Sequence, residues 1–154
     1  MSTTLSAADL TVTVTETIQL KDKDQGATTS ITISSINEVY QRIVTCAASQ
    51  TTTVAVFNSN AYGAAGAIDI EDSKYIRVTN LDDTNPVELA IVGAATLYQV
   101  TLVAGHSHIL GSADGLMLAE AVTNPSFGTM ADLDSIQVNP GSNAVDVEIF
   151  IASA

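Results

Sequence analysis

Two histidines of the chain stand two positions apart, in the segment His106-Ser107-His108. Alternate residues of a β-strand face the same side, so both imidazole rings could share a metal ion. A metal site needs at least a third ligand, and the sequence does not identify one. We therefore interpret the pair as structural or surface residues, with a pH-sensitive interface as the functional alternative.

Oxygen-bearing side chains gather in a second segment, Asp82-Asp83-Thr84-Asn85. Such a cluster could bind a hard cation such as calcium, but it lacks the ordered spacing of a calcium loop. Asp and Asn are also standard turn residues, and we predict a turn here and at Asp69, Glu71 and Asp72. The sequence predicts no metal site and no bound cofactor.

The single cysteine, Cys46, is the only candidate thiol nucleophile. No His or Lys adjoins it in sequence, so we predict a buried thiol in a strand. The chain has no nucleophile elbow, no glycine loop for phosphate and no zinc-type Cys/His spacing. We predict no catalytic residue and no enzymatic activity.

Composition and charge limit the partners that the chain can have. Apolar residues make up 46% of it and aromatic residues 5%, and the net charge is −12. The bases number five, namely Lys21, Lys23, Arg42, Lys74 and Arg77. Binding to phosphate needs clustered basic residues, which excludes nucleic acid and anionic membranes as expected partners. Solubility or a salty medium explains the acidity, and a basic partner surface is the alternative.

Neither a secretory signal nor a membrane helix is predicted. The N-terminus lacks a cationic region followed by an apolar one, and no run reaches about 18 apolar residues. We expect synthesis in the cytoplasm.

Period-two alternation of apolar residues dominates the chain between residues 75 and 111. Four alternating segments, 75–79, 87–92, 98–102 and 106–110, are separated by turn residues. This pattern predicts a β-meander of antiparallel strands with one face buried.

The pattern of the N-terminal part predicts a long strand over residues 10–20 and a second strand over 30–36. These two strands could form a hairpin. The first strand alternates apolar residues with threonines, and its threonine face is expected to meet solvent or a neighbour. Gly26 is the expected positive-φ position of the turn between them.

Further strands are predicted over 52–58, 131–138 and 144–152, the last two with alternating buried positions, and residues 67–73 are expected to hold a short strand and an acidic turn. Residues 37–47 fit a strand better than a helix. Residues 59–67 are expected to form a loop, 116–122 a helical turn or a short strand, and Pro140-Gly141 a type II turn. Together these features predict an all-β, antiparallel, jelly-roll-like sandwich of about nine or ten strands. It forms a single domain over 1–154, with a polar leader over 1–8.

Several segments also resemble small β-structured virion proteins of marine tailed bacteriophages, including those that infect cyanobacteria. The most specific are IRVTNLDDTN at 76–85 and LVAGHSHIL at 102–110, followed by LDSIQV and the terminal VDVEIFIASA. The similarity runs from TVTVTETIQL, residues 11–20, to the end of the sequence.

The resemblance implies a structural role and transfers no site residues. It implies a virion component that binds the major capsid protein or other virion proteins, and we favour a trimeric capsid decoration or cement protein over joins between capsomers. The alternatives are a neck, tail or head-fibre component and, in another class, a carbohydrate-binding module.

Overall fold

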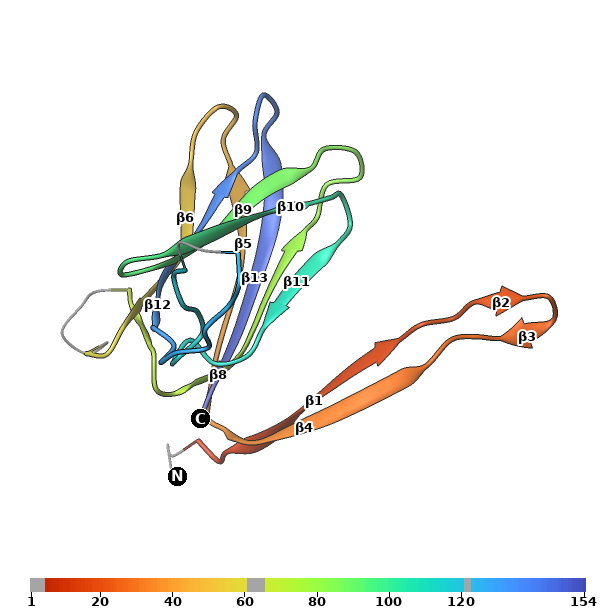
Figure 1. Cartoon of the computed structure of the whole chain (residues 1–154), viewed down its shortest axis with the longest axis horizontal. Coiled ribbons are helices and arrows are strands. Elements are labelled where there is room, and N and C mark those ends of the chain that lie inside the picture. The colour runs from red at the N-terminus through yellow and green to blue at the C-terminus, as the bar shows by residue number, and fades with distance from the viewer. Residues whose placement is uncertain (1–4, 61–65, 121–122) are drawn as a thin grey trace.

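The protein folds into a β-sandwich body from which a long hairpin projects (Figure 1). The computed structural model describes residues 5–60, 66–120 and 123–154. These residues form thirteen strands and no helix, so the described part contains no helical membrane span. Three strands have only two residues each, which leaves ten longer ones. The prediction of an all-β sandwich is confirmed.

Four strands build the projecting hairpin, which we call the arm (residues 8–36). In its long part β1 (Ala8–Thr15) pairs antiparallel with β4 (Thr28–Ile36), and near its tip β2 (Gln19–Leu20) pairs with β3 (Lys23–Asp24). The predicted hairpin is therefore confirmed. The strand predicted over 10–20 is interrupted at residues 16–18.

The body contains two sheets. In the four-stranded sheet the order is β11 (Ser107–Leu110), β8 (Ser73–Asn80), β13 (Val145–Ser153) and β5 (Glu38–Cys46). In the five-stranded sheet the order is β10 (Leu97–Leu102), β9 (Val87–Gly93), β12 (Leu133–Asn139), β6 (Thr52–Asn58) and β7 (Ile68–Asp69). The strand prediction for 37–47 is confirmed as β5.

Antiparallel pairing in the body is nested along the chain. Strand β9 pairs with β10, β8 with β11, β6 with β12, and β5 with β13. This winding of two chain halves around each other is typical of a jelly roll.

The predicted meander over 75–111 is wrong. Of its four segments only β9 and β10 form a hairpin, while β8 and β11 pair in the opposite sheet. The chain crosses between sheets at 81–86 and at 103–106, where the turn residues look like those of ordinary hairpin loops. Period-two alternation shows which side chains are buried, but it does not identify the neighbouring strand.

The core lies between the two sheets and follows the predicted alternation. Its largest side chains with less than 2% exposure come from β8, β9, β12 and β13: Ile76, Val78, Val87, Leu89, Ile91, Leu133, Ile136, Val138, Val145, Val147, Ile149 and Ile151. Between the buried positions of β13, Asp146 is exposed and Glu148 is half-buried.

The turn at the arm tip differs from its prediction. Positive φ occurs at Lys21 (51°) and Asp22 (61°), as a two-residue hairpin turn requires, and Gly26 is not among the positive-φ residues. Glycine at position 26 has another reason, since a Cβ there would overlap the backbone carbonyl of Glu16 on the facing segment of the arm. In contrast, Gly141 has the predicted positive φ (70°).

Two predicted segments extend beyond the described residues. Residues 61–65 of the predicted loop and 121–122 of the segment 116–122 lie outside them. In the described part of 116–122, Met117 forms an isolated antiparallel bridge with Ala131 and no helical turn is present.

Candidate interaction surface

The arm is anchored to the body at its base and free along the rest of its length. Ile36, Tyr75 and Ala152 are buried together at the base, and Leu10 and Phe150 pack against them. Asn37 N donates a hydrogen bond to Ser153 O beside this cluster, 3.0 Å away. Beyond it the arm leaves the body, and its tip lies far from both sheets (Figure 1).

The two faces of the arm have opposite chemistry. Cα pairing places Leu10 opposite Ile33 and Val12 opposite Ile31, so the face toward the body is apolar. The other face carries only hydroxyl side chains between residues 11 and 32: Thr11, Thr13, Thr15, Thr28, Ser30 and Thr32. Thr13 and Ser30 share a hydrogen bond of 2.8 Å on this face. The predicted exposure of the threonine face is confirmed.

The apolar face of the arm remains largely exposed to solvent. Val14 is 48% exposed and Ile31 is 51% exposed, and Ile18 and Leu20 nearer the tip are similar. A two-stranded hairpin is marginally stable in water by itself, and an apolar surface gains stability when it is buried. The arm therefore has the properties of a segment that is completed by contact with another surface.

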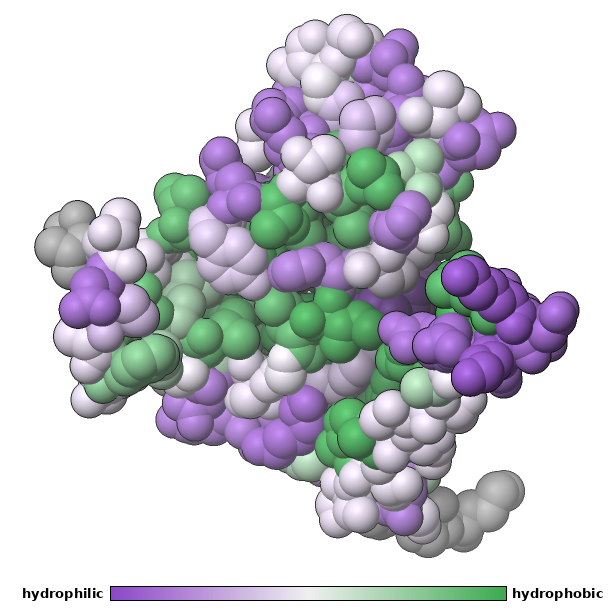
Figure 2. Space-filling view, turned by 45° about the vertical axis from the view of Figure 1, so that its right-hand side comes forward, coloured by the Kyte–Doolittle hydropathy of each residue, from purple (hydrophilic) through white to green (hydrophobic). Residues whose placement is uncertain are grey.

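A groove of about 340 Å³ separates the apolar face of the arm from the outer face of the four-stranded sheet. Tyr75, Arg77, Ile109 and Phe150 line it on the sheet side. In Figure 2 hydrophobic residues gather on the body beside the arm, whose tip is hydrophilic. Arg77 also lies over the Phe150 ring and forms an ion pair with Glu148. The arm thus leans over the β8 and β11 side of this sheet.

The opposite side of the same sheet ends in an open edge. Among the described residues β5 pairs with β13 alone, over all nine of its residues. Val39 and Ile43 on its outer face are 53% and 60% exposed. A long edge strand with exposed apolar residues is a template for pairing with another chain.

An acidic hollow lies where β5 ends. Thr45, Leu81 and the carboxylates of Asp82, Asp83 and Asp146 line it. Asp82 has a structural role there, because its Oδ1 accepts hydrogen bonds from the backbone N–H groups of Thr84 (2.8 Å) and Asn85 (2.6 Å). These bonds lower the pKa of Asp82. The predicted turn at 82–85 is confirmed.

The other turn predicted from acidic residues is also present. Asp69 Oδ1 accepts a hydrogen bond from the N–H of Glu71 at 3.0 Å. No group of three or more His, Cys, Asp or Glu side chains within the described ranges is placed to hold a metal ion.

The two histidines have different surroundings. His106 is exposed and precedes β11, with Nδ1 2.9 Å from Ala104 O. His108 is half-buried on β11, and its Nε2 lies 3.1 Å from the Tyr98 hydroxyl of β10. This bond joins the edge strands of the two sheets. Burial lowers the pKa of His108 and raises the pKa of Tyr98.

We expect a pH dependence of stability from His108. Its pKa is lowered in the folded protein, so the unfolded chain takes up the proton first as the pH falls below about 6.5. The stabilisation from neutral His108 is complete above that pH and is lost as the pH falls through the lower, folded value. The midpoint of thermal unfolding of the His108→Gln variant should therefore depend less on pH between 7.5 and 5.5 than that of the parent. The exposed control His106→Gln should keep the parent's profile; an unchanged profile for His108→Gln would contradict this assignment.

Cys46 is fully buried at the end of β5, as predicted for a thiol in a strand. Burial raises the pKa of its thiol, which keeps it protonated at neutral pH. It is therefore a core side chain.

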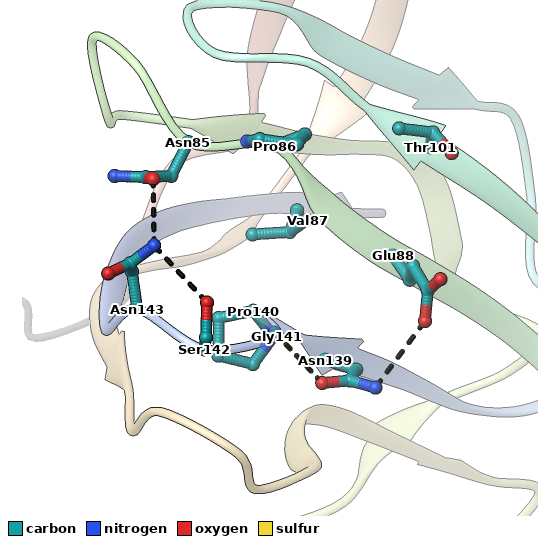
Figure 3. A pocket seen from close by; sticks show the side chains of 10 residues that line it. All are labelled: Asn85, Pro86, Val87, Glu88, Thr101, Asn139, Pro140, Gly141, Ser142 and Asn143. Atoms are coloured by element: carbon teal, nitrogen blue, oxygen red, sulfur yellow. Dashed lines mark hydrogen bonds between the residues drawn. The ribbon is translucent and has the colours of Figure 1, made fainter.

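A hollow of about 320 Å³ at one end of the sandwich is lined by amides (Figure 3). Asn143 Nδ2 donates to Asn85 Oδ1 at 3.0 Å, and Asn139 Nδ2 donates to Glu88 Oε2 at 3.4 Å. The first bond ties the turn between β12 and β13 to the loop before β9. These polar groups bind one another and leave no evident ligand site among the described residues of the hollow. We call Asn85, Asn139 and Asn143 the amide latch, because their side-chain hydrogen bonds hold neighbouring segments together.

The predicted candidates do not converge on one site: His108 lies at one edge of the sandwich, Cys46 in the core and Asp82 in a turn. Sequence reasoning missed the projection of the arm and the open edge of β5. A signal for the arm was present, since one face of the predicted hairpin carries only hydroxyl groups.

Comparison with known proteins gives little further identification. No protein-family model and no curated protein sequence matches the chain. One solved structure is similar, described as "Bacillus endospore appendages form a novel family of disulfide-linked pili", with a TM-score of 0.40 and 13% identity. The match covers 75% of this chain and 88% of that one. A likeness at this level transfers neither fold family nor function, and the arm and the β5 edge stand as the candidate interaction surface.

Proposed function

We propose that this protein is a structural subunit of a larger particle, a bacteriophage virion, and within it a capsid decoration protein. The main observation in support of a structural role is the arm, which projects from a folded body and exposes an apolar face. Assembly buries such surface and stabilises the joined state by mass action.

The distribution of chemistry over the molecule supports a binding role over a catalytic one. The sandwich body holds its polar groups in turns and edge contacts, as the bonds of Asp82 and of Tyr98 with His108 illustrate. The exposed apolar side chains of the arm and of β5, in contrast, have no role within the monomer. They fit contacts between subunits.

The resemblance of segments 76–85 and 102–110 to marine phage virion proteins supports the virion as the particle. A net charge of −12 disfavours contact with packaged DNA and favours an outer position. On the capsid surface the arm would lie across a join between neighbouring subunits.

A second candidate is a neck or tail component. Each subunit has one arm and one open edge, so the arm of one subunit could contact the edge of the next. Such head-to-tail contacts close into a ring when the rotation between successive subunits permits it. Such rings occur where the head and tail of a particle meet, so the arm supports this position as well.

Copy number distinguishes these positions. Quantitative mass spectrometry of purified virions, with the major capsid protein as the internal standard, should find this protein at a ratio near one, or at one per few capsid subunits. A dozen or fewer copies per virion would place it in the neck, tail or fibre. Absence from virions would overturn the proposal, and binding on a glycan array would then favour the carbohydrate-binding alternative.

A further inference from the structure

Two long strand edges among the described residues have no neighbouring strand and have matching properties. Strand β5 presents a free edge nine residues long, and β4 of the arm is also nine residues long with its outer backbone edge free. Each carries exposed apolar side chains, Val39 and Ile43 on β5 and Ile31 on β4. Each would be stabilised by an additional strand beside it.

We propose that the partner of the arm is a second copy of this chain, in which the arm adds to the sheet edge at β5. Main-chain hydrogen bonds between β4 of one copy and β5 of the next would extend the four-stranded sheet. The arm of the same copy leans toward β8 and β11 at the other side of that sheet. It therefore leaves β5 open to the arm of a neighbour (Figure 1). The inference rests on the proposed structural role and names the partner within it.

The positions of the lysines and of the acidic hollow favour one direction for this contact. Two of the five basic residues of the chain, Lys21 and Lys23, lie at the arm tip. The tip also carries Asp22 and Asp24, whose carboxylates stand on shorter side chains than the lysine ammonium groups; Asp24 accepts a hydrogen bond from Gly26 N at 2.9 Å. The acidic hollow of Asp82, Asp83 and Asp146 lies at the Cys46 end of β5, where Thr45 pairs with Asp146. Opposite charges align partners and select their orientation.

With the tip at the Cys46 end, the two strands run antiparallel. The chain runs from the tip toward the base along β4, from Thr28 to Ile36, and toward the acidic hollow along β5, from Glu38 to Cys46. Residues 19–24 lie beyond Thr28 and extend past the end of β5, so the two lysines reach the hollow. Ile31 then lies along the same edge as Val39 and Ile43.

This contact joins unlike surfaces, and each copy offers one of each. Copies related in this way form chains or closed rings, in contrast to arm-to-arm pairing, which stops at two. A contact between unlike surfaces also makes a sharp prediction: two variants that each lack one surface should complement one another.

The test uses the full-length chain and sedimentation velocity over a wide range of concentration. The parent should form oligomers that grow with concentration. Ile31→Asp removes the arm surface and Ile43→Asp the edge surface, and each alone should weaken association at least about tenfold, because a carboxylate would be buried at the contact. An equimolar mixture of the two variants should form dimers, since the intact arm of one fits the intact edge of the other.

Matched controls separate this contact from its alternatives. Thr32→Asp introduces the same charge on the hydroxyl face of β4, next to Ile31, and should leave association unchanged. Ile109→Asp lies on β11 in the groove beneath the arm, and it should also leave association unchanged. Far-UV circular dichroism checks that each variant is folded, and Val39→Asp replaces Ile43→Asp if the latter does not fold.

Three results would overturn the inference: a parent that stays monomeric at every concentration, a mixture that does not complement, or association lost in Ile109→Asp and kept in Ile43→Asp. The last would place the partner in the groove. A monomeric parent that is abundant in purified virions would refute self-association and leave the structural role intact, so the two failures can be told apart.

Discussion

The Ile149→Ala variant is expected to lower the free energy of unfolding by about 2–5 kcal/mol, because it opens a cavity at the centre of the core. Ile149 has 0% exposure and lies on β13, between β5 and β8. The matched change Ile31→Ala on the exposed arm should cost about 1 kcal/mol or less.

Urea unfolding followed by circular dichroism, at a concentration where the chain is monomeric, measures both values. The contrast separates an isoleucine that holds the monomer together from one that is available for a partner. Equal losses in the two variants would show that the arm is part of the cooperative core, and would contradict its assignment as an interaction surface.

The Asn80→Ala variant is expected to lower the free energy of unfolding by about 2–4 kcal/mol, because it leaves buried carbonyl groups without donors. Asn80 has 0% exposure at the end of β8. Its Nδ2 donates to Asn85 O at 2.9 Å and to Leu102 O at 3.0 Å, and its Oδ1 accepts from Asp82 N at 3.0 Å. One side chain thus holds the loop that leaves β8 against the end of β10.

Thermal and urea unfolding of Asn80→Ala should be compared with Asn143→Ala, an exposed member of the amide latch. The control should change stability by less than about 0.5 kcal/mol. A loss of similar size in both variants would mean that the crossover does not depend on Asn80.

Much of the sandwich core can be predicted from the sequence, because buried and exposed side chains alternate along a strand with a period of two residues. The alternation in 144–152 correctly predicts that Val145, Val147, Ile149 and Ile151 face the core, and the same reasoning identifies the buried face of β8 and β9. The choice of neighbouring strand is not readable in this way. It depends on long-range contacts such as the pairing of β5 with β13, about a hundred residues apart in sequence.

The contacts of individual residues are also not predictable from the sequence alone. Glycine serves both positive φ and close backbone approach, and the sequence alone does not tell that Gly26 serves the second. His108 was paired in sequence with His106, but the fold gives it Tyr98, which belongs to the opposite sheet. The arm alternates apolar and polar residues as a half-buried strand does, so its projection into solvent becomes visible only in three dimensions.

Hydrogen–deuterium exchange of the arm tests the central claim, that this segment exists to contact a partner, most directly. The amides of residues 8–36 are to be measured by mass spectrometry at low and high protein concentration, with the buried strand β13 as the internal reference. We predict fast exchange in the arm at low concentration and strong protection at high concentration or in particles, with β13 protected throughout. Arm exchange that is equally fast in the free and assembled protein would contradict the account.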